Sequence, residues 1–135
     1  MRGHDVVMTP RDFCYLDYPQ FAEGDPYVYH SPWSAPLTLE KAYSFDPVAG
    51  IPESVRLHIV GGQANVWGEQ IRTVFDLEWK TWPRACAIAE VLWLGDAKPK
   101  FGDFRLRMES HRRRLIEAGV NCAPLATPKY DIKIR

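Results

Sequence analysis

The fold of this chain is decided by the stretch Gly61-Gly62-Gln63-Ala64-Asn65-Val66-Trp67-Gly68-Glu69. The paired glycines permit close backbone approach or a bend at the entry to a strand, and the β-branched valine favours an extended backbone. On such a backbone Trp67 and Glu69 point the same way, because side chains alternate between the two faces of a strand. We therefore predict a short buried strand that ends in an aromatic ring and a carboxylate.

An indole ring beside a carboxylate also suits the chemistry of a sugar. Apolar C–H groups of a sugar stack on the ring, and its hydroxyls donate hydrogen bonds to carboxylate oxygens. The other interpretation is a core tryptophan and a surface glutamate, because large aromatic side chains are often buried. The spacing makes Trp67 and Glu69 candidate sugar-binding residues but leaves both interpretations open.

A second strand end of the same kind lies near the N-terminus. Residues 5–10 are an apolar run that Pro10 ends, which predicts a strand buried on both faces of a parallel sheet. Tyr15 and Asp17 follow it, again two residues apart. Because ligand sites of α/β folds lie beyond the carboxyl ends of the strands, we expect both pairs to serve one site.

The segment between the two strands is predicted to be a loop and a short helix. Residues 19–36 are rich in Pro, Tyr and Gly, and Trp33 in this loop is either a pocket wall or a simple anchor. Residues 38–45 predict a helix capped by Thr38 and ended by the Asp46-Pro47 pair.

Two helical pieces are predicted directly after the central strand. The first covers residues 72–80, and the second begins at Pro83, runs to about Leu94 and stops at Gly95. In the second helix Arg84 and Glu90 could form ion pairs, which contribute little on an exposed surface.

Residues 101–118 predict the clearest amphipathic helix of the chain. Phe101, Phe104, Met108 and Leu115 fall on one stripe, while the arginines mostly face water. Gly119 is the expected stop, and residues 120–135 are expected to lie on the surface as a tail.

The predicted order of strands and helices indicates an α/β fold with parallel strands and a right-handed crossover. A closed (β/α)8 barrel needs about 250 residues, so this chain could supply only a quarter of its strands. We expect three parts: residues 1–95 from such a barrel, a terminal helix at 96–120 that packs on it, and the tail at 121–135.

Composition excludes several classes of protein. The chain has 135 residues, 46% of them hydrophobic, which suits a packed domain rather than disorder. Seventeen basic residues balance seventeen acidic ones, so we predict no nucleic-acid binding, and acidic residues interrupt the arginine-rich helix. No apolar run approaches the roughly 20 residues of a membrane helix, and the sequence after Met1 has no signal-peptide pattern.

The cysteines and histidines give no sign of a metal site. Cys14, Cys86 and Cys122 are widely spaced, form no CxxC pair and have no zinc spacing with any of the four histidines. We predict free, mostly buried thiols and no cofactor.

Five segments, in order along the chain, make up one pattern. They are Val6-Val7-Met8-Thr9-Pro10, Tyr15-Leu16-Asp17-Tyr18, the run from Leu39 to Pro47, the run from Gly61 to Glu69, and Trp82-Pro83-Arg84-Ala85. The combination resembles the family-20 glycoside hydrolases, the β-N-acetylhexosaminidases. Trp-x-Glu and Trp-Pro-Arg are weak motifs alone, but with Tyr-x-Asp at this separation they are specific. The resemblance places the chain at the last two strands of the family's TIM barrel, plus the final helices.

The resemblance implies retaining, substrate-assisted removal of terminal N-acetylglucosamine or N-acetylgalactosamine, in which the substrate's acetamido oxygen is the nucleophile. Tyr15 matches the tyrosine that holds and polarises the acetamido group. Asp17 and Glu69 match carboxylates that accept hydrogen bonds from sugar hydroxyls, and Trp67 matches a wall of the pocket. Trp33 resembles the loop tryptophan near the sugar's hydroxymethyl end. The partners it implies are glycans that end in an N-acetylhexosamine.

The main departure from the family pattern concerns the acid catalyst. The family's acid catalyst and its orienting partner are an adjacent Asp-Glu pair on an earlier strand, and no Asp-Glu dipeptide occurs in these 135 residues. The sugar-contacting arginine of an early strand is also missing. A general acid contributes about 10²–10⁴-fold to such reactions. We therefore expect this chain to be inactive alone and to need the N-terminal part of the barrel as its partner.

Three hypotheses remain open from the sequence. The first is the C-terminal part of a β-N-acetylhexosaminidase, with an exposed apolar barrel edge when isolated. The second is a stand-alone carbohydrate-binding or scaffold module without catalysis. The third is an unrelated α/β enzyme that uses Asp17 and Glu69 as paired carboxylates. The sequence does not give the compartment, although the family is often secreted, periplasmic or lysosomal.

Overall fold

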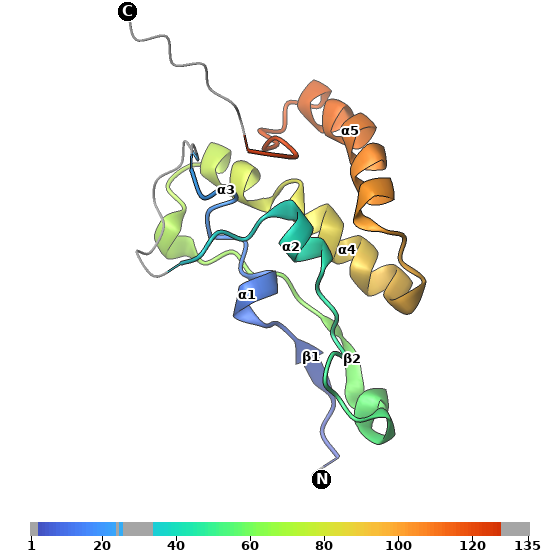
Figure 1. The fold of residues 1–135 in the computed structure, drawn as a ribbon. Coiled ribbons are helices and arrows are strands. Elements are labelled where there is room, and N and C mark those ends of the chain that lie inside the picture. Colours follow the sequence, from blue (N-terminus) through green and yellow to red (C-terminus); the bar gives the residue numbers. More distant parts are fainter. Residues whose placement is uncertain (1–2, 24, 26–33, 128–135) are drawn as a thin grey trace, which may run out of the picture.

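The structure, a computed structural model, describes residues 3–23, 25 and 34–127. Its regular elements follow in chain order (Figure 1): β1 (Val6–Met8), α1 (Arg11–Cys14), α2 (Leu39–Tyr43), β2 (Ile59–Gly62), α3 (Val74–Thr81), α4 (Arg84–Leu94) and α5 (Phe101–Glu117). Short 3-10 turns lie at η1 (Glu53–His58), η2 (Gly68–Gln70) and η3 (Gly95–Ala97). No helix in the described ranges is long and apolar enough to cross a membrane.

The two strands form a parallel pair, as predicted. Met8 of β1 lies opposite Gly62 of β2, and a separate parallel bridge joins Tyr15 to Asn65. Figure 1 shows the strands side by side at the end of the molecule that carries the N-terminus, with the helices gathered toward the other end. The α/β class is therefore confirmed for the described part of the chain.

The central strand is shorter than predicted. Residues 53–58 form η1 rather than strand, β2 ends at Gly62, and Glu69 lies in the 3-10 turn η2. The expectation of one strand up to Glu69 is therefore wrong. Trp67 does keep an extended backbone, with φ −85° and ψ 131°, because the chain still runs beside residues 14–16 at Asn65.

The predicted burial of both strands is not observed in this chain. Val6 is 42% exposed, Val7 51% and Val60 60%. Valines on a two-stranded sheet stay in contact with water when no other element covers their face, and a two-stranded sheet is marginal on its own. The unburied valines leave an apolar sheet surface that needs a cover.

The helices lie where the sequence predicts them, because their ends carry local signals. Thr38 caps α2 by accepting a hydrogen bond from the backbone N–H of Lys41. Thr73 and Asp76 form a capping box at the start of α3. Gly95 ends α4 and Gly119 follows α5, with φ of 53° and 84°, which suits residues without a Cβ. The single turn α1 carries no such signal and was not predicted.

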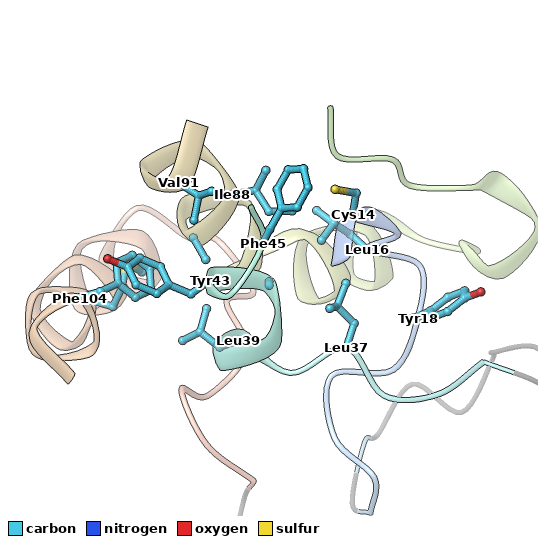
Figure 2. Close-up of a cluster of buried hydrophobic side chains, with 13 residues drawn as sticks. Cys14, Leu16, Tyr18, Leu37, Leu39, Tyr43, Phe45, Ile88, Val91 and Phe104 are labelled. Carbon is cyan, nitrogen blue, oxygen red and sulfur yellow. The ribbon is translucent and has the colours of Figure 1, made fainter. Parts of the chain in front are cut away.

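The hydrophobic core lies between α2, α4 and α5 (Figure 2). Leu39, Ala42 and Tyr43 of α2 are buried, and Ile88 and Val91 of α4 are buried with them. The ring of Tyr43 stacks on Phe104 of α5 with centroids 4.4 Å apart. The apolar faces predicted for the helices at residues 38–45 and 101–118 are confirmed.

The expected surface tail begins inside the molecule. Cys122 and Ala123 are buried, and Arg112 of α5 donates hydrogen bonds to both of their carbonyl oxygens, at 3.1 and 2.8 Å. Arg112 is therefore an exception to the water-facing arginines of this helix. The free-thiol prediction is confirmed: Cys14, Cys86 and Cys122 are unpaired.

Gly62 is packed so closely that we expect substitution to destabilise the sheet. A Cβ at this position would lie 2.6 Å from Leu92 Cδ2 and 3.2 Å from the carbonyl oxygen of Met8. We expect Gly62→Ala to lower the free energy of unfolding by about 1–3 kcal/mol through overpacking, measured by chemical denaturation. Gly68→Ala is the matched control, because a Cβ there meets nothing within 4 Å. Equal stabilities of the two variants would contradict this packing.

Candidate functional site

The candidate site forms where residues 14–16 run beside Asn65. The backbone N–H of Leu16 donates to the carbonyl of Asn65 at 2.7 Å, and the N–H of Asn65 donates to the carbonyl of Cys14 at 2.8 Å. This pairing continues the parallel arrangement of β1 and β2 past their carboxyl ends. It brings the ring of Tyr15 to 5.6 Å from the ring of Trp67, centroid to centroid.

A pocket of about 510 Å³ opens at this point. Its walls come from α1, from the two chain segments that pair at Tyr15 and Asn65, and from η2: Arg11, Tyr15, Asp17, Tyr18, Trp67, Glu69 and Gln70. Four of the five residues singled out from the sequence therefore share one pocket. The fifth, Trp33, lies outside the described residues.

Asp17 is the buried carboxylate of the pocket. Its side chain is only 7% exposed. Burial raises its pKa, while hydrogen bonds from backbone N–H groups, including that of Trp67, and the charges of Lys80 and Arg84 act the other way. Among the described residues, its Oδ1 atom is buried without a hydrogen-bond partner. A buried acceptor without a donor costs about 1–3 kcal/mol, so a donor that reached this oxygen would stabilise the carboxylate.

Trp67 and Glu69 form the open side of the pocket. Trp67 is 46% exposed, so it is not a core tryptophan in the part of the chain described. Glu69 is exposed as well, and it reaches the pocket from the η2 turn rather than from a strand. The ring face of Trp67 is therefore available for stacking, and the Glu69 carboxylate is available to polar groups of a ligand.

Tyr15 lies between the other two aromatic rings of the pocket. Its ring centroid is 6.1 Å from that of Tyr18, in an edge-to-face arrangement, and 5.6 Å from that of Trp67. These neighbours fix the plane of the Tyr15 ring. Its hydroxyl makes no hydrogen bond within residues 3–23, 25 and 34–127, so it can donate to or accept from a ligand.

Arg84 was interpreted wrongly from the sequence. The sequence allows an ion pair of Arg84 on an exposed surface, but its side chain is fully buried. Its guanidinium donates to the carbonyl oxygens of Leu16 and Tyr18 at 2.5 and 3.0 Å. Glu90 instead bonds to Arg107, at 2.5 Å. One feature of the sequence does point to a buried role for Arg84: it lies four residues after Lys80, and both cations stand among apolar residues.

No group of three or more His, Cys, Asp or Glu side chains within the described ranges is arranged to hold a metal ion. The pocket instead combines two carboxylates, a tyrosine hydroxyl and an exposed indole face. This set can accept hydrogen bonds from hydroxyls, polarise a carbonyl group and stack against an apolar ring face.

The family model for the catalytic domain of glycosyl hydrolase family 20 matches residues 1–96. The chain belongs to glycoside hydrolase family 20. This membership excludes the third hypothesis, an unrelated α/β enzyme. It also confirms the resemblance that the five sequence segments indicated.

The relatives and solved structures that resemble this chain are also enzymes of this kind, which agrees with its membership of family 20. A beta-hexosaminidase of Akkermansia muciniphila is 34% identical over 115 residues, and the beta-hexosaminidase subunit beta of Homo sapiens is 31% identical over 110 residues. The structure of a family-20 exo-β-N-acetylglucosaminidase from Vibrio harveyi, in complex with N-acetylglucosamine, superposes with a TM-score of 0.80 at 33% identity. A Streptomyces coelicolor β-N-acetylhexosaminidase gives the same TM-score at 20% identity, which supports the fold alone.

The chain spans only a small part of these family-20 relatives. The alignments cover 85% and 77% of this chain but 22% and 20% of the Akkermansia and human proteins. The superposition covers 92% of this chain and 19% of the Vibrio chain. The chain therefore corresponds to about a fifth of the length of the relatives it matches.

Proposed function

We propose that this chain is the C-terminal part of the catalytic (β/α)8 barrel of a retaining β-N-acetylhexosaminidase, and that it supplies the sugar-binding side of the active site. One observation carries the proposal: Tyr15, Asp17, Trp67 and Glu69 line one pocket at the carboxyl ends of two parallel strands. Active sites of (β/α)8 enzymes lie at this end of the barrel. The proposed partners are glycans with a terminal N-acetylglucosamine or N-acetylgalactosamine.

Each pocket residue has a chemical role under this proposal. The pyranose ring and acetamido methyl pack against Trp67, and Asp17 and Glu69 accept hydrogen bonds from sugar hydroxyls. The Tyr15 hydroxyl holds and polarises the acetamido group, whose oxygen attacks the anomeric carbon in substrate-assisted hydrolysis. The walls of the pocket thereby orient the nucleophile that the substrate itself provides.

The remaining catalytic groups come from earlier barrel strands. The Asp-Glu pair that protonates the leaving group is absent from the 135 residues, and a general acid contributes about 10²–10⁴-fold. The exposed valines of β1 and β2 leave an apolar sheet surface, which the rest of a closed barrel would cover. The three-part division at 1–95, 96–120 and 121–135 stays a prediction.

Replacement of Trp67 tests the proposed sugar pocket. In the full-length enzyme that carries this chain, we expect Trp67→Ala to raise KM for an N-acetylglucosaminide about 10- to 150-fold, because burying a large apolar side chain stabilises by about 1.5–3 kcal/mol. Trp93→Ala is the matched control, since Trp93 is 88% exposed and lies outside the pocket. An unchanged KM in Trp67→Ala would contradict the assignment.

Two other observations separate the stand-alone module from the enzyme: the behaviour of the 135-residue chain alone and the coding sequence upstream of Met1. A module predicts that the 135-residue chain folds alone and binds N-acetylglucosamine without hydrolysis. The enzyme proposal predicts that hydrolysis requires the longer protein, and that the coding frame upstream of the Met1 codon continues and encodes an adjacent Asp-Glu pair. A stop codon directly upstream, with a ribosome-binding signal, would favour the module.

A further inference from the structure

The segment that carries Asp17 is irregular but buried. Residues 16–21 follow the bridge at Tyr15, belong to no helix or strand, and are all buried. Buried carbonyl groups in such a segment need hydrogen-bond donors, because no strand or helix satisfies them. The donors that satisfy them therefore determine the path of the backbone around Asp17.

Two cations from the helices satisfy these carbonyls one after another. Lys80 Nζ donates to the carbonyl of Asp17 at 2.6 Å. Arg84 donates to the carbonyls on either side: that of Leu16 at 2.5 Å and that of Tyr18 at 3.0 Å, with a longer contact of 3.5 Å to Pro19. Charge-assisted hydrogen bonds of this kind are about twice as strong as neutral ones.

The two cations are themselves fixed in place. Lys80 is 2% exposed and Arg84 0%. Arg84 also donates to the carbonyl of Lys80 at 2.5 Å and to that of Leu37 at 2.9 Å, so it joins α3, α4 and the segment before α2. Burial lowers the pKa of both. That of Arg84 falls to about 9, which leaves its guanidinium charged at neutral pH.

The Asp17 carboxylate has few other supports. The backbone N–H groups of Asp17 itself and of Trp67 act to lower its pKa, and no side chain of the described residues bonds its buried Oδ1 atom. The direction of the carboxylate therefore depends mainly on the backbone at residues 16–18. That backbone is held from behind by Lys80 and Arg84, neither of which lines the pocket.

We propose that Lys80 and Arg84 are positioning residues for substrate binding: they hold the carbonyls at Leu16, Asp17 and Tyr18 and thereby aim the Asp17 carboxylate into the pocket. The inference rests on the proposed function, because the sugar contact belongs to Asp17. A purely structural role would make the two cations important for stability alone. A positioning role makes them important for KM as well.

The test uses Lys80→Met in the full-length enzyme, with Lys98→Met as matched control. Lys98 also donates to two backbone carbonyls, those of Tyr43 and Phe45 at 2.9 and 3.0 Å, but it lies away from the pocket. We expect Lys80→Met to raise KM for an N-acetylglucosaminide about tenfold with kcat within about twofold, the change when one hydrogen bond to a charged group weakens. Lys98→Met lowers Tm and leaves KM unchanged.

Arg84→Lys is the second variant, because Arg84→Ala removes every guanidinium donor from a buried cluster and risks misfolding. A lysine keeps the charge but lacks the fork that reaches several carbonyls at once. We expect its KM to rise about as much as in Lys80→Met. Unchanged KM in both folded variants would overturn the positioning role.

A double variant ties the effect to Asp17. In an Asp17→Asn background, Lys80→Met should add little to KM, because the group that it positions is already altered. A full additional tenfold rise would show that Lys80 acts elsewhere and would overturn the inference. If Asp17→Asn alone leaves KM unchanged, the proposed sugar contact of Asp17 is contradicted, and the positioning role loses its basis. If Asp17→Asn raises KM and Lys80→Met does not, the positioning role alone fails.

Discussion

Tyr15→Phe in the full-length enzyme is expected to lower kcat about 10²–10³-fold with little change in KM. The proposed role of the Tyr15 hydroxyl is to polarise the acetamido group as charge develops during attack, and loss of one such donor typically has this effect. The ring itself stays in place between Tyr18 and Trp67, so the pocket keeps its shape. Steady-state kinetics with an aryl N-acetylglucosaminide measures both constants.

Tyr43→Phe is the control for loss of a tyrosine hydroxyl. The Tyr43 hydroxyl has two acceptors for its one hydrogen, Glu90 Oε1 at 3.0 Å and the carbonyl oxygen of Pro99 at 2.8 Å, in the core away from the pocket. This variant should lose stability and keep kcat. A Tyr15→Phe enzyme with wild-type kcat would show that the hydroxyl takes no part in the reaction.

Asp17→Asn is expected to raise KM about 10- to 150-fold, because hydrogen bonds to charged groups are worth about 1.5–3 kcal/mol. The amide can also place an N–H group against the backbone N–H of Trp67, which in the native protein favours the ionised carboxylate. Glu69→Gln should have a smaller effect, because Glu69 is exposed and water competes for it. Isothermal titration with N-acetylglucosamine compares the two variants.

The burial of Asp17 also predicts that sugar affinity depends on pH. Burial raises the pKa of the carboxyl group, and only the ionised form accepts hydrogen bonds with both oxygens. Sugar affinity should therefore be full above this raised pKa and fall as the pH drops through it, at a higher pH than for an exposed aspartate. Sugar affinity of the Asp17→Asn variant should not depend on pH in this way. If the dependence remained in that variant, another titrating group would be its cause.

Much of the fold could be predicted because its signals are local. Thr38 as a cap, Pro83 at a first turn and Gly95 as a stop act within one helical turn, and all three helix ends were found. The lengths of the strands could not be predicted in this way. Strand pairing depends on partners distant in sequence, and here the pairing at Gly62 ends before Trp67.

The candidate site was predicted better than the groups that support it. The pocket is lined by residues that their spacing predicts: Tyr15 with Asp17, and Trp67 with Glu69. The role of Arg84 was missed, because an arginine on a helix is most often a surface residue. Its hydrogen-bond partners are backbone carbonyls. Every residue has such a group, so residue types do not indicate which residues Arg84 contacts.

The most direct test of the account is a crystal structure of the full-length protein with N-acetylglucosamine bound. We predict that the sugar ring lies against Trp67, that the Asp17 carboxylate accepts a hydroxyl at about 2.7 Å, and that the Tyr15 hydroxyl bonds the acetamido group. A structure in which other parts of the barrel fill this pocket, with the sugar bound elsewhere, would contradict the account.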